Sequence, residues 1–102
     1  MADDLGEVRM RLRTVARIAA LELEPAEVDG RAALLREGEP VALGWLDLIA
    51  FPLPPDALEG LTGIEPGPHA GWTAVQAWQP ELPAGEGLTR LAAALRRAAA
   101  RR

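Results

Sequence analysis

Residues 41–51 read VALGWLDLIAF, a stretch that contains one charged side chain, Asp47. Val41, Trp45 and Leu48 recur at steps of four and three residues, which is the spacing of one helix face. The positions between them are also largely apolar, so a helix built from this segment is apolar nearly all round. Such a helix has to be buried by the rest of the chain or by another chain. We therefore predict a buried helix over residues 41–51.

Two more helices are predicted upstream of this stretch. Residues 7–23 place Val8, Leu12 and further apolar residues at helical spacing, which predicts an amphipathic helix. Its short run VRMRL alternates as a half-buried strand would, but the Ala-rich continuation favours the helix. Pro25 suits the first turn of a second helix, because the amide hydrogen it lacks would be unpaired there. That helix is expected to break at 38–40, which reads Gly-Glu-Pro.

Proline and glycine dominate the downstream stretch 52–87, which contains seven Pro and six Gly. We predict an extended strap there, because regular structure does not persist through so many of these residues. Large apolar side chains recur along it, which is not typical of a disordered linker. A short strand is possible within 71–80. Trp72 and Trp78 either fold back onto the helices or anchor the strap to a partner, since Trp is enriched at interface hot spots.

The chain ends in an Ala-rich and Arg-rich segment, 88–102, whose apolar spacing predicts a terminal helix. Arg96, Arg97, Arg101 and Arg102 offset the negative end of its dipole or bind an acidic surface. The predicted fold class is mostly α: a short helical bundle followed by an extended strap and a C-terminal helix. The predicted organisation is one domain with a helical part at 1–51, the strap at 52–87 and the terminal helix at 88–102.

The residue inventory argues against catalysis by this chain alone. It has no Ser, Cys, Lys, Tyr or Asn, so the nucleophiles that covalent catalysis usually employs are missing. His69 is the one imidazole, and without Cys no closed zinc site can be built. We expect no catalytic, metal or cofactor residues. No apolar run has the length of a membrane span, and the start MADDLGEV lacks signal-peptide features, so a cytoplasmic protein is expected.

Charge is distributed unevenly along the chain. The net charge is −4 and the pI is about 4.9, which argues against a general nucleic-acid binder. Residues 88–102 nevertheless carry five Arg and no acid, and Arg9, Arg13 and Arg17 lie four residues apart on one helix face. These cations are solvated surface, or they bind an acidic partner. A small regulator that binds nucleic acid through them is an alternative function.

Two stretches resemble a known family of small subunits. The run VARIAALELEPAEV, 15–28, is similar to the opening helices of the C subunit of tRNA-dependent amidotransferases. The run LGWLDLIAFPLPPDALEG, 43–60, resembles the GatC-like small subunit of the carboxybiuret hydrolase, whose second helix ends in Phe-Pro-Leu-Pro. Here that motif is 51–54, with Asp56 after it. The resemblance covers about residues 8–60.

This resemblance implies a non-catalytic accessory subunit that wraps and stabilises a larger amidase-signature enzyme, which carries all of the catalytic residues. The expected partner contacts lie on the apolar helix, on the Phe-Pro-Leu-Pro motif and on the strap: Trp45, Leu48, Phe51, Pro52, Leu53, Pro54, Trp72 and Trp78. A third possibility is a self-associating module, in which the helix over 41–51 pairs with its own copy.

Overall fold

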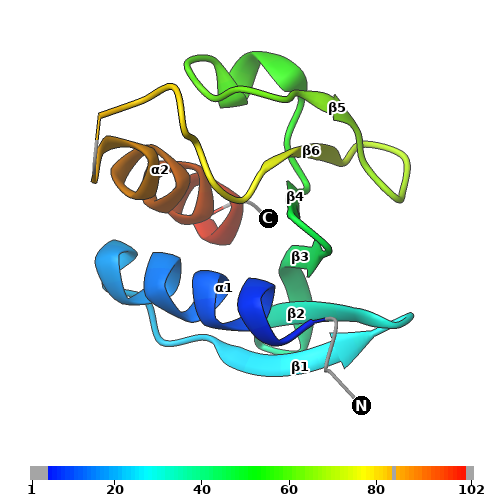
Figure 1. The fold of residues 1–102 in the computed structure, drawn as a ribbon. Coiled ribbons are helices and arrows are strands. Elements are labelled where there is room, and N and C mark those ends of the chain that lie inside the picture. Colours follow the sequence, from blue (N-terminus) through cyan, green and yellow to red (C-terminus); the bar gives the residue numbers. More distant parts are fainter. Residues whose placement is uncertain (1–4, 84, 101–102) are drawn as a thin grey trace.

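A computed structural model describes residues 5–83 and 85–100. In chain order the elements are α1 (Gly6–Ala19), β1 (Glu24–Val28), β2 (Arg31–Arg36), β3 (Glu39–Trp45), β4 (Leu48–Phe51), the 3₁₀ helix η1 (Pro55–Leu58), β5 (Glu65–Pro66), β6 (Thr73–Gln76) and α2 (Glu86–Ala100). The strands form one antiparallel sheet in the order β1-β2-β3-β4-β6-β5 (Figure 1). The prediction of a mostly helical bundle is therefore wrong: the fold is α+β.

Two tight turns convert the predicted second helix into strands. Asp29-Gly30 joins β1 to β2, and Glu37-Gly38 joins β2 to β3; all four residues have positive φ, between 52° and 83°. Positive φ at both central residues matches the twist of a two-residue hairpin turn, and glycine adopts it without strain. The glycines interpreted as weak points of a helix are therefore turn residues.

The predicted helix over 41–51 is also wrong, because this stretch forms β3 and β4. Ala42 and Ile49 belong to the core beneath the helices, whereas Leu43 and Ala50 lie on the alternate positions and are buried too. A strand that is buried on both faces reads as a continuous apolar run instead of an alternating one. The sequence of this stretch therefore mimics a helix that is apolar all round.

Helix α1 confirms the predicted N-terminal helix, although it ends at Ala19 and not at residue 23. Ala20 follows it with φ 59°, a left-handed C-cap, and its N–H donates to the Arg17 carbonyl at 3.0 Å. Val8 and Leu12 pack closely on β3 at Gly44. A Cβ at Gly44 would lie 2.7 Å from Val8 Cγ2 and 3.1 Å from Leu12 Cδ1, so only glycine leaves room for this approach.

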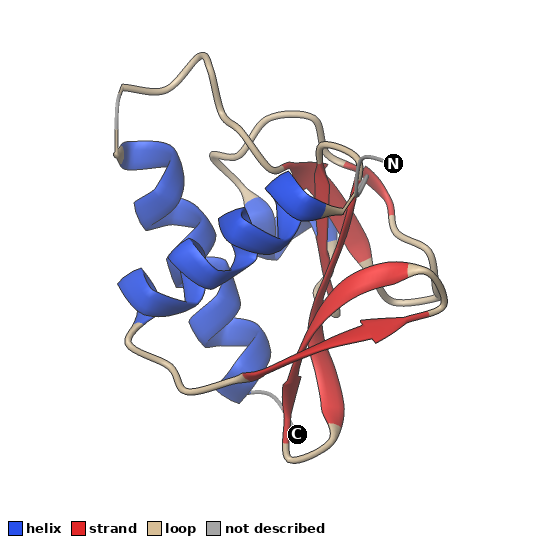
Figure 2. Ribbon diagram, turned by 60° about the horizontal axis from the view of Figure 1, so that its bottom comes forward, coloured by secondary structure: helices blue, strands red, loops and turns tan. Residues whose placement is uncertain are grey.

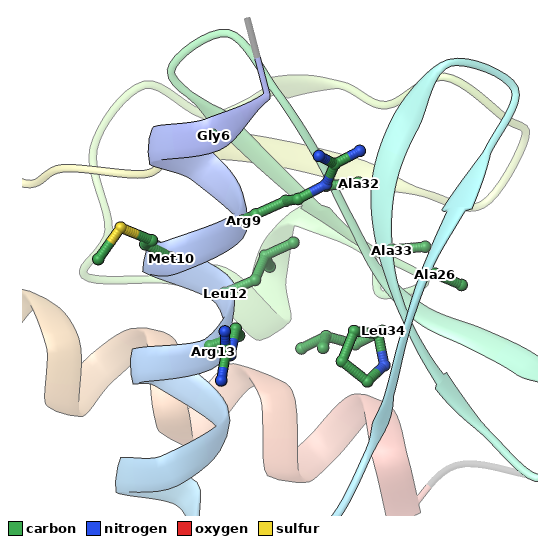
Figure 3. Close-up of a pocket in the computed structure, with 10 residues that line it drawn as sticks. Gly6, Arg9, Met10, Leu12, Arg13, Ala26, Ala32, Ala33 and Leu34 are labelled. Atoms are coloured by element: carbon green, nitrogen blue, oxygen red, sulfur yellow. The ribbon is translucent and has the colours of Figure 1, made fainter. Parts of the chain in front are cut away.

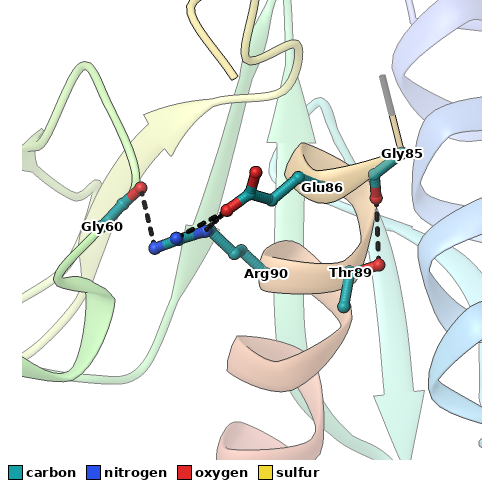
Figure 4. A network of polar contacts seen from close by, with 5 residues as sticks. All are labelled: Gly60, Gly85, Glu86, Thr89 and Arg90. Carbon is teal, nitrogen blue, oxygen red and sulfur yellow. Dashed lines mark hydrogen bonds and ion pairs between the residues drawn. The ribbon is translucent and has the colours of Figure 1, made fainter. Parts of the chain in front are cut away.

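Helix α2 confirms the predicted terminal helix. At its start Thr89 Oγ1 donates to the Gly85 carbonyl at 2.9 Å, and the Arg90 guanidinium pairs with Glu86 at 2.7 Å (Figure 4). Further along, Arg96 Nε donates to the Ala19 carbonyl at 3.1 Å, which ties α2 to the end of α1. Arg101 and Arg102 lie outside the described residues. Neither helix has the length and apolar character needed to cross a bilayer.

The Pro/Gly-rich stretch is folded onto the core. Leu53, Leu58 and Leu61 are buried in it at 4%, 1% and 7% exposure. Gln79 Oε1 accepts hydrogen bonds from the Thr62 N–H at 2.7 Å and from Thr62 Oγ1 at 2.8 Å, and these bonds join two segments within the stretch. The short strand predicted within 71–80 is confirmed as β6, and it pairs with β4.

Candidate functional site

Helices α1 and α2 lie on one side of the sheet, and no helix of the described residues lies on the other side (Figure 2). We call the first side the inner face and the second the outer face. Gly44 fixes which residues belong to each, because it lies against Val8 and Leu12 of α1. Its neighbours Leu43 and Trp45 therefore belong to the outer face.

A row of small and apolar residues runs across the middle of the outer face. The strand register pairs Ala26 with Ala33, Ala33 with Leu43, Leu43 with Ala50, and Ala50 with Ala74. Leu43, Ala50 and Ala74 are at most 1% exposed, although no helix covers them. This row contains no polar side chain from β1 to β6, so the centre of the outer face is apolar.

A second row on the same face holds the larger side chains. Trp45 is paired with Leu48, and Leu48 with Gln76. The Arg31 guanidinium lies over the Trp45 ring, 4.8 Å from its centroid, in a cation-π contact. Arg31 Nε is buried and makes no hydrogen bond within the described residues. Trp and Arg, the residue types enriched at interface hot spots, are thus stacked together on the outer face.

Leu46 lies at the tip of the β3–β4 hairpin, next to this second row. Its side chain is 67% exposed and its φ is 53°, in the left-handed region. That conformation costs an ordinary L-residue about 1–2 kcal/mol, and glycine or asparagine normally takes it. The other two hairpins place Asp29 and Glu37 at the same turn position, with φ of 52° and 53°, and each is followed by glycine. The third hairpin differs in that an apolar residue takes this position. The third hairpin therefore displays an apolar side chain at the cost of backbone strain.

A hollow lies at the β5 edge of the sheet. Pro54, Pro55, Ile64, Pro66 and Trp72 are among the residues that line it, and its volume is about 680 Å³. Ile64 is 42% exposed, and Trp72 is half-buried. The lining is mainly apolar, with Glu65 as its charged member.

The local backbone holds Trp72 in this hollow. The Gly67 N–H donates to the Trp72 carbonyl at 2.9 Å, and a Cβ at Gly67 would lie 2.7 Å from the Trp72 backbone. The His69 ring meets the Trp72 ring edge-on, with the centroids 6.1 Å apart. Glycine at 67 is therefore required for the loop to close on Trp72.

The structure divides the eight predicted partner-contact residues into two groups. Trp45 and Leu48 lie on the outer face. Pro54 and Trp72 line the hollow at the β5 edge, and Pro52 lines a second hollow, which also includes Ala98 of α2.

Phe51, Leu53 and Trp78 instead pack in or against the core, so a folded monomer does not present them to a partner. Arg11 covers Trp78, with its guanidinium 5.5 Å from the ring centroid and its Nε bonded to the Ala77 carbonyl at 2.8 Å. Burial lowers the pKa of Arg11. For Trp78, the interpretation that it folds back onto the helices is confirmed.

Sequence reasoning missed Arg31 and Leu46. Once a helix was assigned to 41–51, Leu46 became one more apolar position on its side, and Arg31 fell on a different helix. A turn assignment at residues 46–47 would have identified Leu46 as an apolar residue where turn formers are expected. Within the part of the chain that the structure describes, no three His, Asp or Glu side chains are grouped to hold a metal ion.

Comparison with family models, with curated proteins and with solved structures gave no significant match. The assignment below therefore depends on the geometry of this chain.

Proposed function

We propose that this chain is a non-catalytic protein-binding module, and that it docks on a partner protein through the outer face of the sheet. The docking surface consists of the Trp45–Leu48 pair with Arg31, the Leu46 tip and the Trp72 hollow. Its polar members include Arg31 and Glu65, which are suited to ion pairs and hydrogen bonds with a partner. The surface is thus suited to recognition of another protein.

Leu46 is the observation that carries this proposal. Two features of Leu46 cost free energy. Its backbone adopts a left-handed conformation, and its apolar side chain faces water. Burial of a leucine side chain by a partner recovers about 1–2 kcal/mol, which is comparable with the strain. Strain of this kind persists where it contributes to function.

The amidase-type partner stays a prediction from the resemblance. The structure forms strands where that resemblance implies the second helix, so the fold lends it no support and the proposed partner is not restricted to that enzyme class. The cytoplasmic location likewise stays a prediction from the sequence. The resemblance and the geometry both favour binding of another protein, and only the resemblance suggests which enzyme class that protein belongs to.

Affinity capture from an extract of the source cells tests the proposal. The bait is the tagged full chain, and the variant is Leu46→Asn, because asparagine tolerates the left-handed backbone and lacks the apolar side chain. We expect the folded variant to retain about a tenth or less of the protein captured by the wild-type chain. The matched control is Glu37→Asn, which also introduces asparagine at φ 53°, but in the β2–β3 turn. This variant should capture as much protein as the wild-type chain.

Equal capture by the wild-type chain and Leu46→Asn would contradict the proposal, and so would the absence of any specifically captured protein. Sedimentation velocity of the purified chain identifies one special case. If the wild-type chain is a dimer and Leu46→Asn is a monomer, the partner is a second copy.

A further inference from the structure

A groove lies between α1 and the strands β1 and β2. Its volume is about 470 Å³ (Figure 3). Leu12 projects from α1 toward the strands, and Pro25 of β1 and Leu34 of β2 also line the groove. Leu12 and Leu34 are each 2% exposed, so the floor of the groove is apolar and rigidly packed.

The rim of the groove is positively charged. Arg9 and Arg13 both project from α1 at this groove. Arg9 Nη2 is 2.7 Å from Glu27 Oε1, so Arg9 already forms an ion pair at this rim. Arg13 is exposed and makes no hydrogen bond or ion pair within the described residues. A cationic rim on a chain of net charge −4 attracts anionic ligands.

We propose that this groove binds an acidic peptide segment of a partner protein, with one or two aliphatic side chains on the apolar floor and carboxylates paired with Arg9 and Arg13. The length of β1 corresponds to about five extended residues, at roughly 3.3 Å per residue. The inference does not rest on the proposed function, because Arg9, Leu12 and Arg13 of α1 form one side of the groove, whereas Arg31, Trp45, Leu46, Leu48 and Trp72 do not line it.

The chemistry of the lining favours a peptide over nucleic acid. Proteins that bind single-stranded nucleic acid stack its bases on aromatic side chains. The described residues that line the groove are mainly aliphatic, with two arginines, and none of them is Trp, Phe or His. Its apolar floor accommodates leucine or a similar side chain, which a phosphate backbone does not supply.

The charges at the rim allow two opposite predictions, one variant that should tighten peptide binding and one that should weaken it. A bound carboxylate competes with Glu27 for Arg9, so removal of the Glu27 charge should tighten binding. Surface ion pairs of this exposure are weak, and the expected gain for Glu27→Gln is about two- to fivefold in Kd. Loss of the unpaired cation in Arg13→Gln should weaken binding by about three- to tenfold.

The probe is a phage-displayed library of random linear heptapeptides, selected on the immobilised full chain. We expect the recovered peptides to combine Asp or Glu with Leu, Ile or Met. The Kd of the best peptide is then measured by fluorescence anisotropy for the wild-type chain and for the two groove variants. Arg97→Gln is the charge-matched control, because Arg97 is an exposed cation on α2 that does not line the groove, and it should change Kd less than twofold.

Three results would overturn the proposal: no enriched peptide, enriched peptides without acidic residues, or Kd values that Arg13→Gln and Glu27→Gln leave unchanged. Binding of a single-stranded RNA more tightly than the best peptide, with loss in Arg13→Gln, would assign the rim to nucleic acid instead. The Leu46→Asn variant should bind the peptide normally. The experiments can therefore contradict the groove proposal without contradicting the proposed function, and the reverse.

Discussion

Replacement of Gly44 by alanine tests how α1 lies on the sheet, and this arrangement decides which face of the sheet the helices cover. The new methyl group would lie 2.7 Å from Val8 Cγ2 and 3.1 Å from Leu12 Cδ1. Carbon atoms prefer separations of about 3.5–4.0 Å, so the overlap with Val8 is close to 1 Å. Val8 is fully buried and cannot rotate away, so the helix must shift.

The expected effect on stability is the balance of two terms. Overpacking of a core costs about 1–3 kcal/mol, whereas a Gly→Ala replacement at an unstrained position gains about 0.4–1 kcal/mol by restricting the unfolded chain. Gly44 has no positive φ, so the gain applies in full. The net change is a loss of about 1–2 kcal/mol in the free energy of unfolding, which lowers Tm by about 5–10 °C in a domain of this size.

Urea denaturation followed by circular dichroism measures this change, and a double-mutant cycle with Val8→Ala identifies its cause. Removal of the Val8 methyl groups leaves space for the new one. In the Val8→Ala background, Gly44→Ala should therefore cost much less than in the wild-type chain, or even stabilise the fold. A neutral Gly44→Ala variant, or additive effects in the cycle, would refute the packing of α1 on β3.

Three further predictions concern the core and its polar supports. Phe51→Ala should lower the free energy of unfolding by about 3–5 kcal/mol in urea denaturation, because Phe51 is fully buried. A loss below about 1 kcal/mol would instead support the sequence-based prediction that Phe51 contacts a partner at the surface. Gln79→Leu should lower the free energy of unfolding by about 1–3 kcal/mol, because the Thr62 amide loses its hydrogen-bond acceptor. Hydrogen exchange of that amide should become faster, and unchanged exchange would contradict the hydrogen bond. Arg90→Gln should lower the free energy of unfolding by about 0.5 kcal/mol or less, and this loss should vanish in high salt, since the ion pair with Glu86 is exposed. A loss that does not depend on salt would mean that another contact of Arg90 dominates.

The sequence predicted the two terminal helices and the short strand β6, because each has a local periodicity that matches its structure. The central strands were missed for a physical reason. Leu43 and Ala50 are buried on the outer face while Ala42 and Ile49 are buried on the inner face, so the alternation that marks a strand is absent. The two turns at Asp29-Gly30 and at 37–38 were the available signals, and they were outweighed by the apolar spacing.

The candidate site was predictable in part. Trp45 and Leu48 were selected as an apolar pair at helical spacing, and they are instead direct cross-strand neighbours on the outer face. Phe51 and Trp78 were selected by the same apolar criterion and are parts of the core. Apolar character alone does not separate a core residue from a docking residue. The separation requires knowledge of which face the helices cover.

Hydroxyl-radical footprinting of the captured complex tests the central claim most directly, because it reports the solvent exposure of individual side chains. The claim is that a partner covers the outer face. We predict that oxidation of Trp45, Leu46 and Trp72 falls in the complex relative to the free chain, whereas oxidation of Met10, which is 70% exposed on α1, reports separately on the peptide groove. An intact complex in which the oxidation of Trp45 and Leu46 is unchanged would contradict the claim.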